Sequence, residues 1–264
     1  MSSRFLSVVL SLLILWPAPA QARELKVCAD PNNLPFSNAR QEGFENRIMR
    51  IVADELGATL TYEWRPQRRR FLRETVKAFR CDGVPGLPAN LQGVATTAPY
   101  YRSSYVFLTR AGEPPISSFD DPRLASLTIG VQLIGDDGYN APPAHALAKR
   151  GLAQQLRGFT VYGDYATDAP EEPIAKAVAA HQIDAAAVWG PTGGYFAARQ
   201  KPPLTVTPVS PAFDGPQLPM VFDISLAVRK SDPQLRDELD AVLKKRRRDI
   251  DAILREYGGP LLSP

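Results

Sequence analysis

Apolar residues in the first part of the chain alternate between short runs and a helical spacing. Residues 25–29 (LKVCA) form a short run typical of a buried strand, and residues 43–56 (GFENRIMRIVADEL) repeat apolar side chains at the spacing of an amphipathic helix. Residues 59–64 alternate like a strand, 68–79 return to a helical spacing, and 82–87 form another strand-like run. This β-α-β-α-β order predicts a parallel sheet.

A second series follows an extended segment that ends near residue 108. The stretch 111–127 (AGEPPISSFDDPRLASL) is rich in Pro, Ser and Asp and is typical of a connection. Beyond it the pattern predicts strands at 127–133, 159–162, 184–188 and 221–228, helices at 142–149 and 172–180, and a helix opening at 194–199. Residues 202–219 contain six prolines and are predicted to be extended or looped. A last helical region begins at Asp232-Pro233 and ends at Gly258-Gly259.

Two strand–helix series joined by long strands predict an α/β protein with two lobes. We expect residues 23–110 together with 216–264 to form lobe 1, and residues 111–215 to form lobe 2. Each lobe is expected to be a mostly parallel sheet flanked by helices, and two crossover strands would connect them. A cleft between such lobes is a natural place for a ligand.

The first residues have the features of a secretory leader. Arg4 precedes an apolar run from Phe5 to Trp16, and small residues end at Ala22, which is the pattern of a cleaved signal peptide. The apolar run is shorter than the ~20 residues that a membrane-spanning helix needs. We therefore expect cleavage near Ala22, removal of residues 1–22 and a periplasmic protein with no membrane span. The alternative is a retained anchor.

Charge and cysteine content narrow the classes of function. Without Arg4 the chain carries 30 basic and 28 acidic residues, which is too balanced to indicate nucleic-acid binding. Cys28 and Cys81 are the only cysteines. An oxidising compartment allows a disulfide between them, but their offset along neighbouring strands leaves two separate buried thiols as the alternative.

Nine short segments occur in an order that resembles a known family. They are CADPNNLPFSN, GFENRI, PQRR, PYYRSSYVF, GVQLIGDDG, PPAHAL, VYGDY, VWGP and EYGGP. Together they resemble periplasmic solute-binding proteins of family 3, and within them the MoxJ/XoxJ-type subgroup that accompanies quinoprotein methanol dehydrogenases. The resemblance implies the type II binding-protein fold. It also implies a role in supporting or maturing a PQQ-dependent methanol dehydrogenase, with a dehydrogenase subunit as partner and its cytochrome c as a second candidate.

Three positions depart from the amino-acid binders of this family. Asn90 stands where those proteins place an arginine for the ligand carboxylate. Asp136 and Asp137 stand at a helix start where hydroxyls and free N–H groups are expected, and Trp189 occupies a strand end that usually carries an acid. An α-amino acid is therefore not the expected ligand. The two aspartates cap the helix, bind a cationic group or face a protein partner, and the sequence leaves these alternatives open.

The candidate cleft residues combine polar and aromatic side chains from both predicted lobes, because aromatic residues are enriched in pockets and at interfaces. They are Asp30, Asn33, Phe36, Asn90, Tyr100, Tyr101, Gln132, Asp136, Asp137, Trp189 and Tyr195.

Two basic clusters are candidate docking sites for an acidic partner. Arg68, Arg69 and Arg70 precede a predicted helix, and residues 244–248 (KKRRR) lie in the last helical region. If that region packs on lobe 1, both clusters lie on the same lobe and speed association with a negatively charged protein. The alternative is an ordinary solvated surface.

No arrangement in the sequence indicates catalysis. His145 and His181 are isolated, no acid and base stand at a chemical spacing, and no metal or cofactor motif occurs. We therefore expect a binding-type accessory protein without enzymatic activity, cofactor or metal. The alternative is the substrate-binding component of an ABC transporter for a small solute that is not a typical α-amino acid.

Overall fold

The computed structural model describes residues 23–68, 70–133, 141–161, 169–258 and 262. The predicted leader, Arg69, Asp136 and Asp137 lie outside these residues. Among the described helices, none is both long and apolar enough to cross a bilayer.

A single ten-stranded mixed sheet forms the centre of the molecule, in the order β4-β1-β5-β12-β7-β10-β8-β9. β6 pairs with β12, and β11 pairs with β7. The strands are β1 Arg23–Ala29, β4 Ala58–Trp64, β5 Gly83–Pro88, β6 Ala95–Thr96, β7 Tyr101–Thr109, β8 Ile129–Leu133, β9 Leu156–Thr160, β10 Ala185–Trp189, β11 Thr205–Pro208 and β12 Val221–Val228. A separate two-stranded sheet joins β2 Asn32–Asn33 to β3 Ser37–Asn38.

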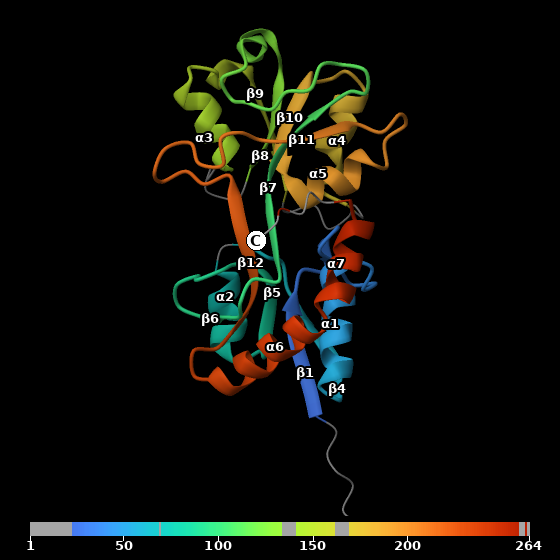
Figure 1. Cartoon of the computed structure of the whole chain (residues 1–264), viewed down its shortest axis with the longest axis vertical. Coiled ribbons are helices and arrows are strands. Elements are labelled where there is room, and N and C mark those ends of the chain that lie inside the picture. Colours follow the sequence, from blue (N-terminus) through green and yellow to red (C-terminus); the bar gives the residue numbers. More distant parts are fainter. Residues whose placement is uncertain (1–22, 69, 134–140, 162–168, 259–261, 263–264) are drawn as a thin grey trace, which may run out of the picture.

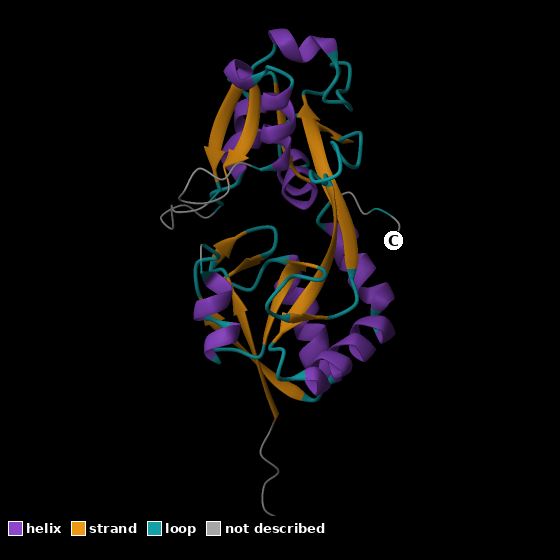
Figure 2. Cartoon of the chain, turned by 90° about the vertical axis from the view of Figure 1, so that its left-hand side faces the viewer, coloured by secondary structure: helices purple, strands orange, loops and turns teal. Residues whose placement is uncertain are grey.

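The strands β7 and β12 connect two bodies of the molecule (Figures 1 and 2). The lower body, here called the first half, contains β1, β4, β5 and β6, and the upper body, the second half, contains β8, β9, β10 and β11. The pairs β4–β1–β5 and β10–β8–β9 are parallel, as predicted, whereas β12 and β7 pair antiparallel with their neighbours. The strands of the two halves join in one sheet through β7, whose residues 101–104 pair with β12 and whose residues 105–108 pair with β10.

The helices gather around the two halves of the sheet (Figure 2). In the first half these are α1 Phe44–Glu55, α2 Phe71–Glu74, α6 Pro233–Lys245 and α7 Arg247–Glu256, and in the second half α3 Pro142–Lys149, α4 Glu172–Ala179 and α5 Gly190–Ala197. Short 3₁₀ helices occupy η1 Val76–Ala78, η2 Pro122–Ser126 and η3 Ala153–Gln155.

The chain returns to the first half at its C-terminal end. Apolar residues of α1, α6 and α7 form one buried cluster with β1, in which Leu25, Ile48, Leu239 and Ile250 are at most 2% exposed. Burying such side chains contributes about 1.5–3 kcal/mol each. The predicted last helical region is therefore two helices packed on the first half, and the two meet at Arg246, which leaves helical geometry.

The helix predicted over residues 68–79 is wrong. Arg70 has φ +71°, Thr75 has φ −116° and ψ −101°, and Phe79 has φ +57°, so the backbone leaves the α region three times. Only the four residues of α2 and the three of η1 remain helical.

A disulfide fixes this part of the first half. Cys28 lies on β1, Cys81 precedes β5, and their Cα atoms are 5.6 Å apart, within the usual range for a disulfide. Because Val27 pairs with Gly83, the expected offset along the strands is small enough to bridge.

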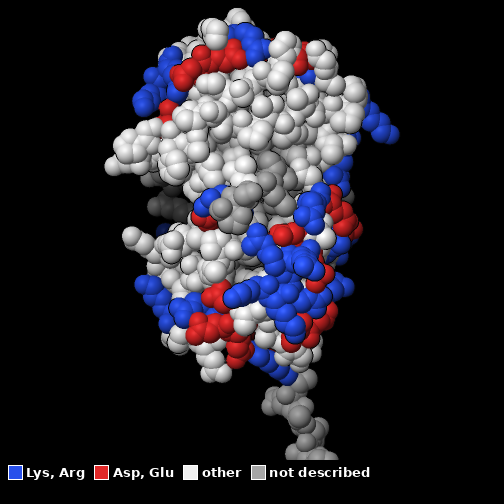
Figure 3. Space-filling view, viewed as in Figure 1, with Lys and Arg blue, Asp and Glu red and all other residues white. Residues whose placement is uncertain are grey.

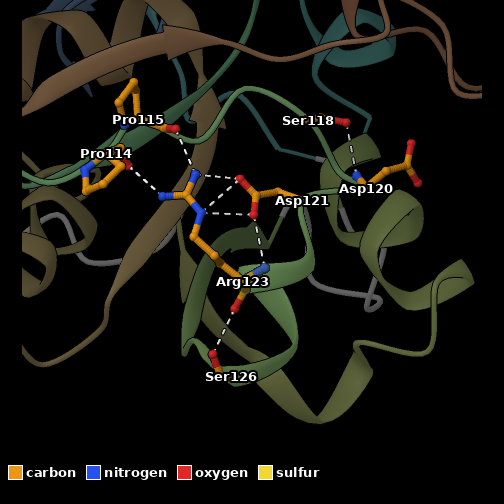
Figure 4. A network of polar contacts seen from close by, with 7 residues as sticks. All are labelled: Pro114, Pro115, Ser118, Asp120, Asp121, Arg123 and Ser126. Carbon is orange, nitrogen blue, oxygen red and sulfur yellow. Dashed lines mark hydrogen bonds and ion pairs between the residues drawn. The ribbon is translucent and has the colours of Figure 1, made fainter.

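The connection 111–127 in the second half is held by one arginine (Figure 4). Arg123 donates from Nη1 and Nη2 to the carbonyl oxygens of Pro114 and Pro115, at 3.0 and 2.9 Å, and pairs with the Asp121 carboxylate. Asp121 also accepts from the Arg123 backbone N–H at 3.0 Å and so caps η2. The segment predicted as a connection therefore contains the 3₁₀ helix η2 and is held by these hydrogen bonds.

Candidate functional site

A cavity of about 230 Å³ lies where the two halves meet the crossing strands. The first half supplies polar and acidic groups, the second half supplies a hydrogen-bonded cluster, and β7 and β12 supply aromatic side chains. Its lining comprises Asn33, Phe36, Glu45, Gln67, Gly86, Pro88, Tyr101, Tyr105, Gln132, Val161, Glu171, Trp189, Thr192, Phe222 and Ile224.

The local structure of the first half turns Glu45 into this cavity. Glu45 lies in the first turn of α1, where an acid usually caps free N–H groups or balances the helix dipole. Here the Glu45 N–H donates to the carbonyl oxygen of Phe36 at 3.0 Å and the Phe44 N–H to that of Pro35 at 2.8 Å. Asn46 Oδ1 accepts from the Gly43 N–H. The helix end is therefore already capped, and the Glu45 side chain is not needed for it.

One oxygen of the Glu45 carboxyl is buried without a hydrogen-bond partner among the described residues. The residue is 6% exposed, and its Oε1 accepts no hydrogen bond from any residue that the structure describes. A Cβ on residue 86 would lie 2.1 Å from this oxygen, and Gly86 has φ +76°, so glycine lets the carboxyl lie against the backbone. Burial raises the pKa of Glu45 to about 8.

The second half holds its own acid in a hydrogen-bonded cluster. Glu171, the residue before α4, is 8% exposed. Its Oε2 accepts from Thr192 Oγ1 at 2.6 Å and from Gln132 Nε2 at 3.4 Å, and Gln132 Oε1 in turn accepts from the Trp189 N–H at 2.8 Å. The pKa of Glu171 is raised to about 7. Burial is the largest cause; the hydrogen bond from Thr192 acts in the opposite direction, and the charge of Asp30 acts in the same direction as burial.

Aromatic rings form one wall of the cavity. Tyr105 and Trp189 lie 5.3 Å apart and Trp189 and Phe222 lie 5.8 Å apart between ring centroids, in edge-to-face contact. Tyr101, on the same crossing strand as Tyr105, is 4% exposed, and burial together with the Glu45 charge raises its pKa. These rings fix the shape of the wall and give it an apolar surface with negative ring faces.

The lining that the structure describes contains two acids and no Lys, Arg or His. A ligand carboxylate therefore finds no cationic partner among these residues. The described part of the chain also has no group of three or more His, Cys, Asp or Glu residues arranged to hold a metal ion. The arrangement accepts hydrogen bonds, and it attracts positive charge once either glutamate is ionised.

Five predicted cleft residues line this cavity: Asn33, Phe36, Tyr101, Gln132 and Trp189. Four others lie elsewhere in the described structure. Asp30 is buried and accepts from the Gln67 N–H at 2.6 Å, Asn90 lies in an exposed turn with φ +60°, the Tyr100 hydroxyl accepts from the Gly86 N–H, and the Tyr195 ring stacks on Tyr257.

The sequence analysis missed both glutamates, Thr192 and Gln67 as residues of the cavity. Glu45 lies inside the GFENRI segment, and Glu171 follows Pro170 at a helix start. Acids at helix starts are ordinary surface features, so only their burial distinguishes these two. A glycine on a neighbouring strand, here Gly86, is a signal that could have indicated the buried position of Glu45.

A basic surface lies outside the cavity, on α6 and α7. Figure 3 shows Lys and Arg side chains gathered over the lower body where these helices lie. Lys245 and Arg246 pair with Glu55, and Arg247 pairs with Asp251. Lys244 and Arg248 are exposed, and neither belongs to an ion pair among the described residues. Of the other predicted cluster, Arg68 is half-buried and Arg70 is exposed at the start of α2.

Comparisons with known proteins agree along nearly the whole chain. Residues 25–260 match the model of the bacterial extracellular solute-binding proteins, family 3. Protein MoxJ of Methylorubrum extorquens is 32% identical, over 97% of this chain and 93% of the relative.

Two solved structures share the fold. MxaJ from Methlophaga aminisulfidivorans superposes with a TM-score of 0.78 at 27% identity, over 90% of this chain and all of that one. The periplasmic binding protein XoxJ from Methylobacterium extorquens gives a TM-score of 0.74 at 35% identity, over 91% of this chain and all of that one. Because the family model matches nearly the whole chain, the chain belongs to family 3 of the bacterial extracellular solute-binding proteins, and it is similar to MoxJ, MxaJ and XoxJ.

Proposed function

We propose that this protein is a non-catalytic periplasmic accessory protein that supports or matures a PQQ-dependent methanol dehydrogenase. The observation that carries the proposal is the full-length similarity to MoxJ and to the structures of MxaJ and XoxJ. In this proposal residues 1–22 direct export and are cleaved near Ala22. Residues 23–110 with 216–264 and residues 111–215 act as the two lobes of a type II binding protein.

The cavity chemistry supports this role over that of an amino-acid receptor. An α-amino acid needs a cation for its carboxylate, whereas Glu45 and Glu171 are the charged groups of the described lining. Asn90, at the position of the usual arginine, lies in an exposed turn. A binding protein that lacks a cation for the ligand carboxylate remains suited to a different ligand or to a protein partner.

The partner is expected to dock on the basic surface of α6 and α7. Lys244 and Arg248 are free to form ion pairs with an acidic protein, and such pairs speed association more than they add affinity. The dehydrogenase subunit is the first candidate, and its cytochrome c is the second. The Arg68, Arg69 and Arg70 cluster remains a second predicted docking site on the same half.

Surface plasmon resonance tests the proposal. The mature protein is immobilised and exposed to the dehydrogenase subunit, purified with and without its quinone. We expect binding whose association rate falls steeply with salt. Lys244→Glu with Arg248→Glu should slow association about tenfold at low ionic strength. The matched control reverses two exposed lysines of the second half, Lys149→Glu with Lys201→Glu.

An association rate that is equal in both variants would remove α6 and α7 from the proposal. Recovery of permease and ATPase subunits alone, in a pull-down from detergent-solubilised whole cells, would instead favour the alternative function. That alternative is the substrate-binding component of an ABC transporter for a small solute, and the cavity between the two halves is the observation that favours it.

A further inference from the structure

The cavity contains an acid with one buried oxygen that accepts no hydrogen bond from any described residue. Glu45 and Glu171 come from opposite halves, and both are more than nine-tenths buried. Glu171 accepts hydrogen bonds from Thr192 and Gln132, whereas Glu45 Oε1 has no partner among the described residues. A buried acceptor of this kind costs free energy unless a ligand supplies the missing donor.

The remaining lining favours an organic cation over a metal ion. Divalent cations need several oxygen ligands around one point, and the described residues hold no such group of acids. Tyr101, Tyr105 and Trp189 line the same cavity, and aromatic faces attract ammonium groups and also pack against an apolar body. The combination of an acid and aromatic walls is complementary to a protonated amine.

The size of the cavity limits the ligand. Its volume of about 230 Å³ lies below the ~300–1,000 Å³ of sites for drug-sized ligands. A ligand with a single ring or a short aliphatic chain fits such a space.

We propose that this cavity binds a small organic cation, a protonated amine on an apolar or aromatic body. Its ammonium group donates to Glu45, Glu171 balances its charge from the opposite half, and its body packs against Tyr105 and Trp189. This site is independent of docking on α6 and α7, so either proposal can fail while the other stands.

Binding must release protons near neutral pH. Burial raises the pKa of Glu45 to about 8 and is the main cause that raises the pKa of Glu171 to about 7, so both acids are largely protonated at pH 6. The charge of Asp30 acts on Glu171, and the charge of Glu45 acts on Tyr62, Tyr100 and Tyr101. An ammonium group favours the ionised carboxylates and lowers both pKa values. Affinity therefore rises from pH 6 to pH 8.

Isothermal titration calorimetry of the mature protein with benzylamine tests the site against a matched neutral compound, benzyl alcohol. At pH 8 we expect benzylamine to bind about tenfold more tightly than benzyl alcohol. Repeating the pH 7 titration in buffers of different ionisation enthalpy should show proton release. Glu45→Gln should weaken benzylamine binding about tenfold and Glu171→Gln less, while Glu63→Gln on β4, outside the cavity, should leave it unchanged.

Equal affinity for the amine and the alcohol in the unmutated protein would overturn the proposal, whether or not the variants fold. Absence of binding by benzylamine at about 10 mM, a concentration that fills even weak sites, would overturn it as well. So would Glu45→Gln protein that melts cooperatively and still binds the amine as tightly as the unmutated protein.

Discussion

The two halves of the molecule each contribute one buried glutamate to the same cavity, and they hold it differently. In the second half, Glu171 sits in a cluster with Thr192 and Gln132 that compensates part of its burial. In the first half, Glu45 lies over Gly86, and its Oε1 has no such partner among the described residues. The pKa of Glu45 is accordingly raised further than that of Glu171. Similar burial thus gives different titration when the hydrogen bonds differ.

The two halves also differ in how their scaffold is fixed. The first half has the disulfide between Cys28 and Cys81, and the second half has no cysteine. There Arg150 pairs with the buried Asp214 at 2.9 Å and with Asp120 at 2.7 Å. The half that contains Glu45 is therefore also the half that contains the disulfide.

The largest expected effect comes from removing that bond. Cys28→Ser with Cys81→Ser opens a link between residues 53 positions apart, and a loop of this length predicts a loss of about 4 kcal/mol in unfolding free energy. Urea unfolding followed by circular dichroism measures it. Far less destabilisation would mean that packing alone fixes the first half, and the contrast with the second half would then disappear.

Glu45→Gln should have the next largest effect, and it should be stabilising at high pH. The pKa of Glu45 is about 8 when folded and 4.5 for the unperturbed group. Folding therefore retains a proton that the unfolded chain releases, and stability is lost as pH rises between these values. We expect the unmutated protein to lose about 2–3 kcal/mol more than the variant between pH 5 and pH 8.

Urea midpoints at several pH values check this prediction. Glu63→Gln, a partly exposed site on β4 of the same half, is the control and should follow the unmutated protein. If Glu45→Gln also follows it at every pH, Glu45 titrates normally and the difference between the two glutamates is lost.

The sequence could predict most elements but not the chemistry of the cavity. Helix α1 and the strands around it follow from apolar spacing, because period alone assigns an amphipathic element. The same spacing predicted a helix over 68–79 that the structure breaks at Arg70, Thr75 and Phe79. Spacing reports which face is apolar, but it does not report the backbone angles that end a helix.

The two buried acids could not be predicted for a related reason. The burial of Glu45 depends on Gly86 of β5, and the setting of Glu171 depends on Gln132 of β8 and Thr192 of α5. These partners lie far away along the chain and are brought together by the fold. Gln132 and Trp189, which were predicted as cleft residues, lie on the neighbouring parallel strands β8 and β10. The carboxyl ends of such strands meet at one edge of the sheet, where ligands commonly bind.

The smallest expected effect tests the origin of the difference between the glutamates. Thr192→Val removes the hydroxyl that donates to Glu171 Oε2 at 2.6 Å. That hydrogen bond lowers the pKa of Glu171, so its loss should raise this pKa above about 7, by an amount worth about 1 kcal/mol. Carbon-13 NMR titration of the glutamate side chains measures both acids in one sample. The pKa of Glu45 is the internal control, because Thr192 lies in the opposite half.

If Glu171 keeps its pKa in the variant, burial alone sets both values and the cluster of the second half has no electrostatic role. If both pKa values move together, the two acids titrate as one coupled pair across the cavity, which a ligand carrying a single positive charge would then bridge.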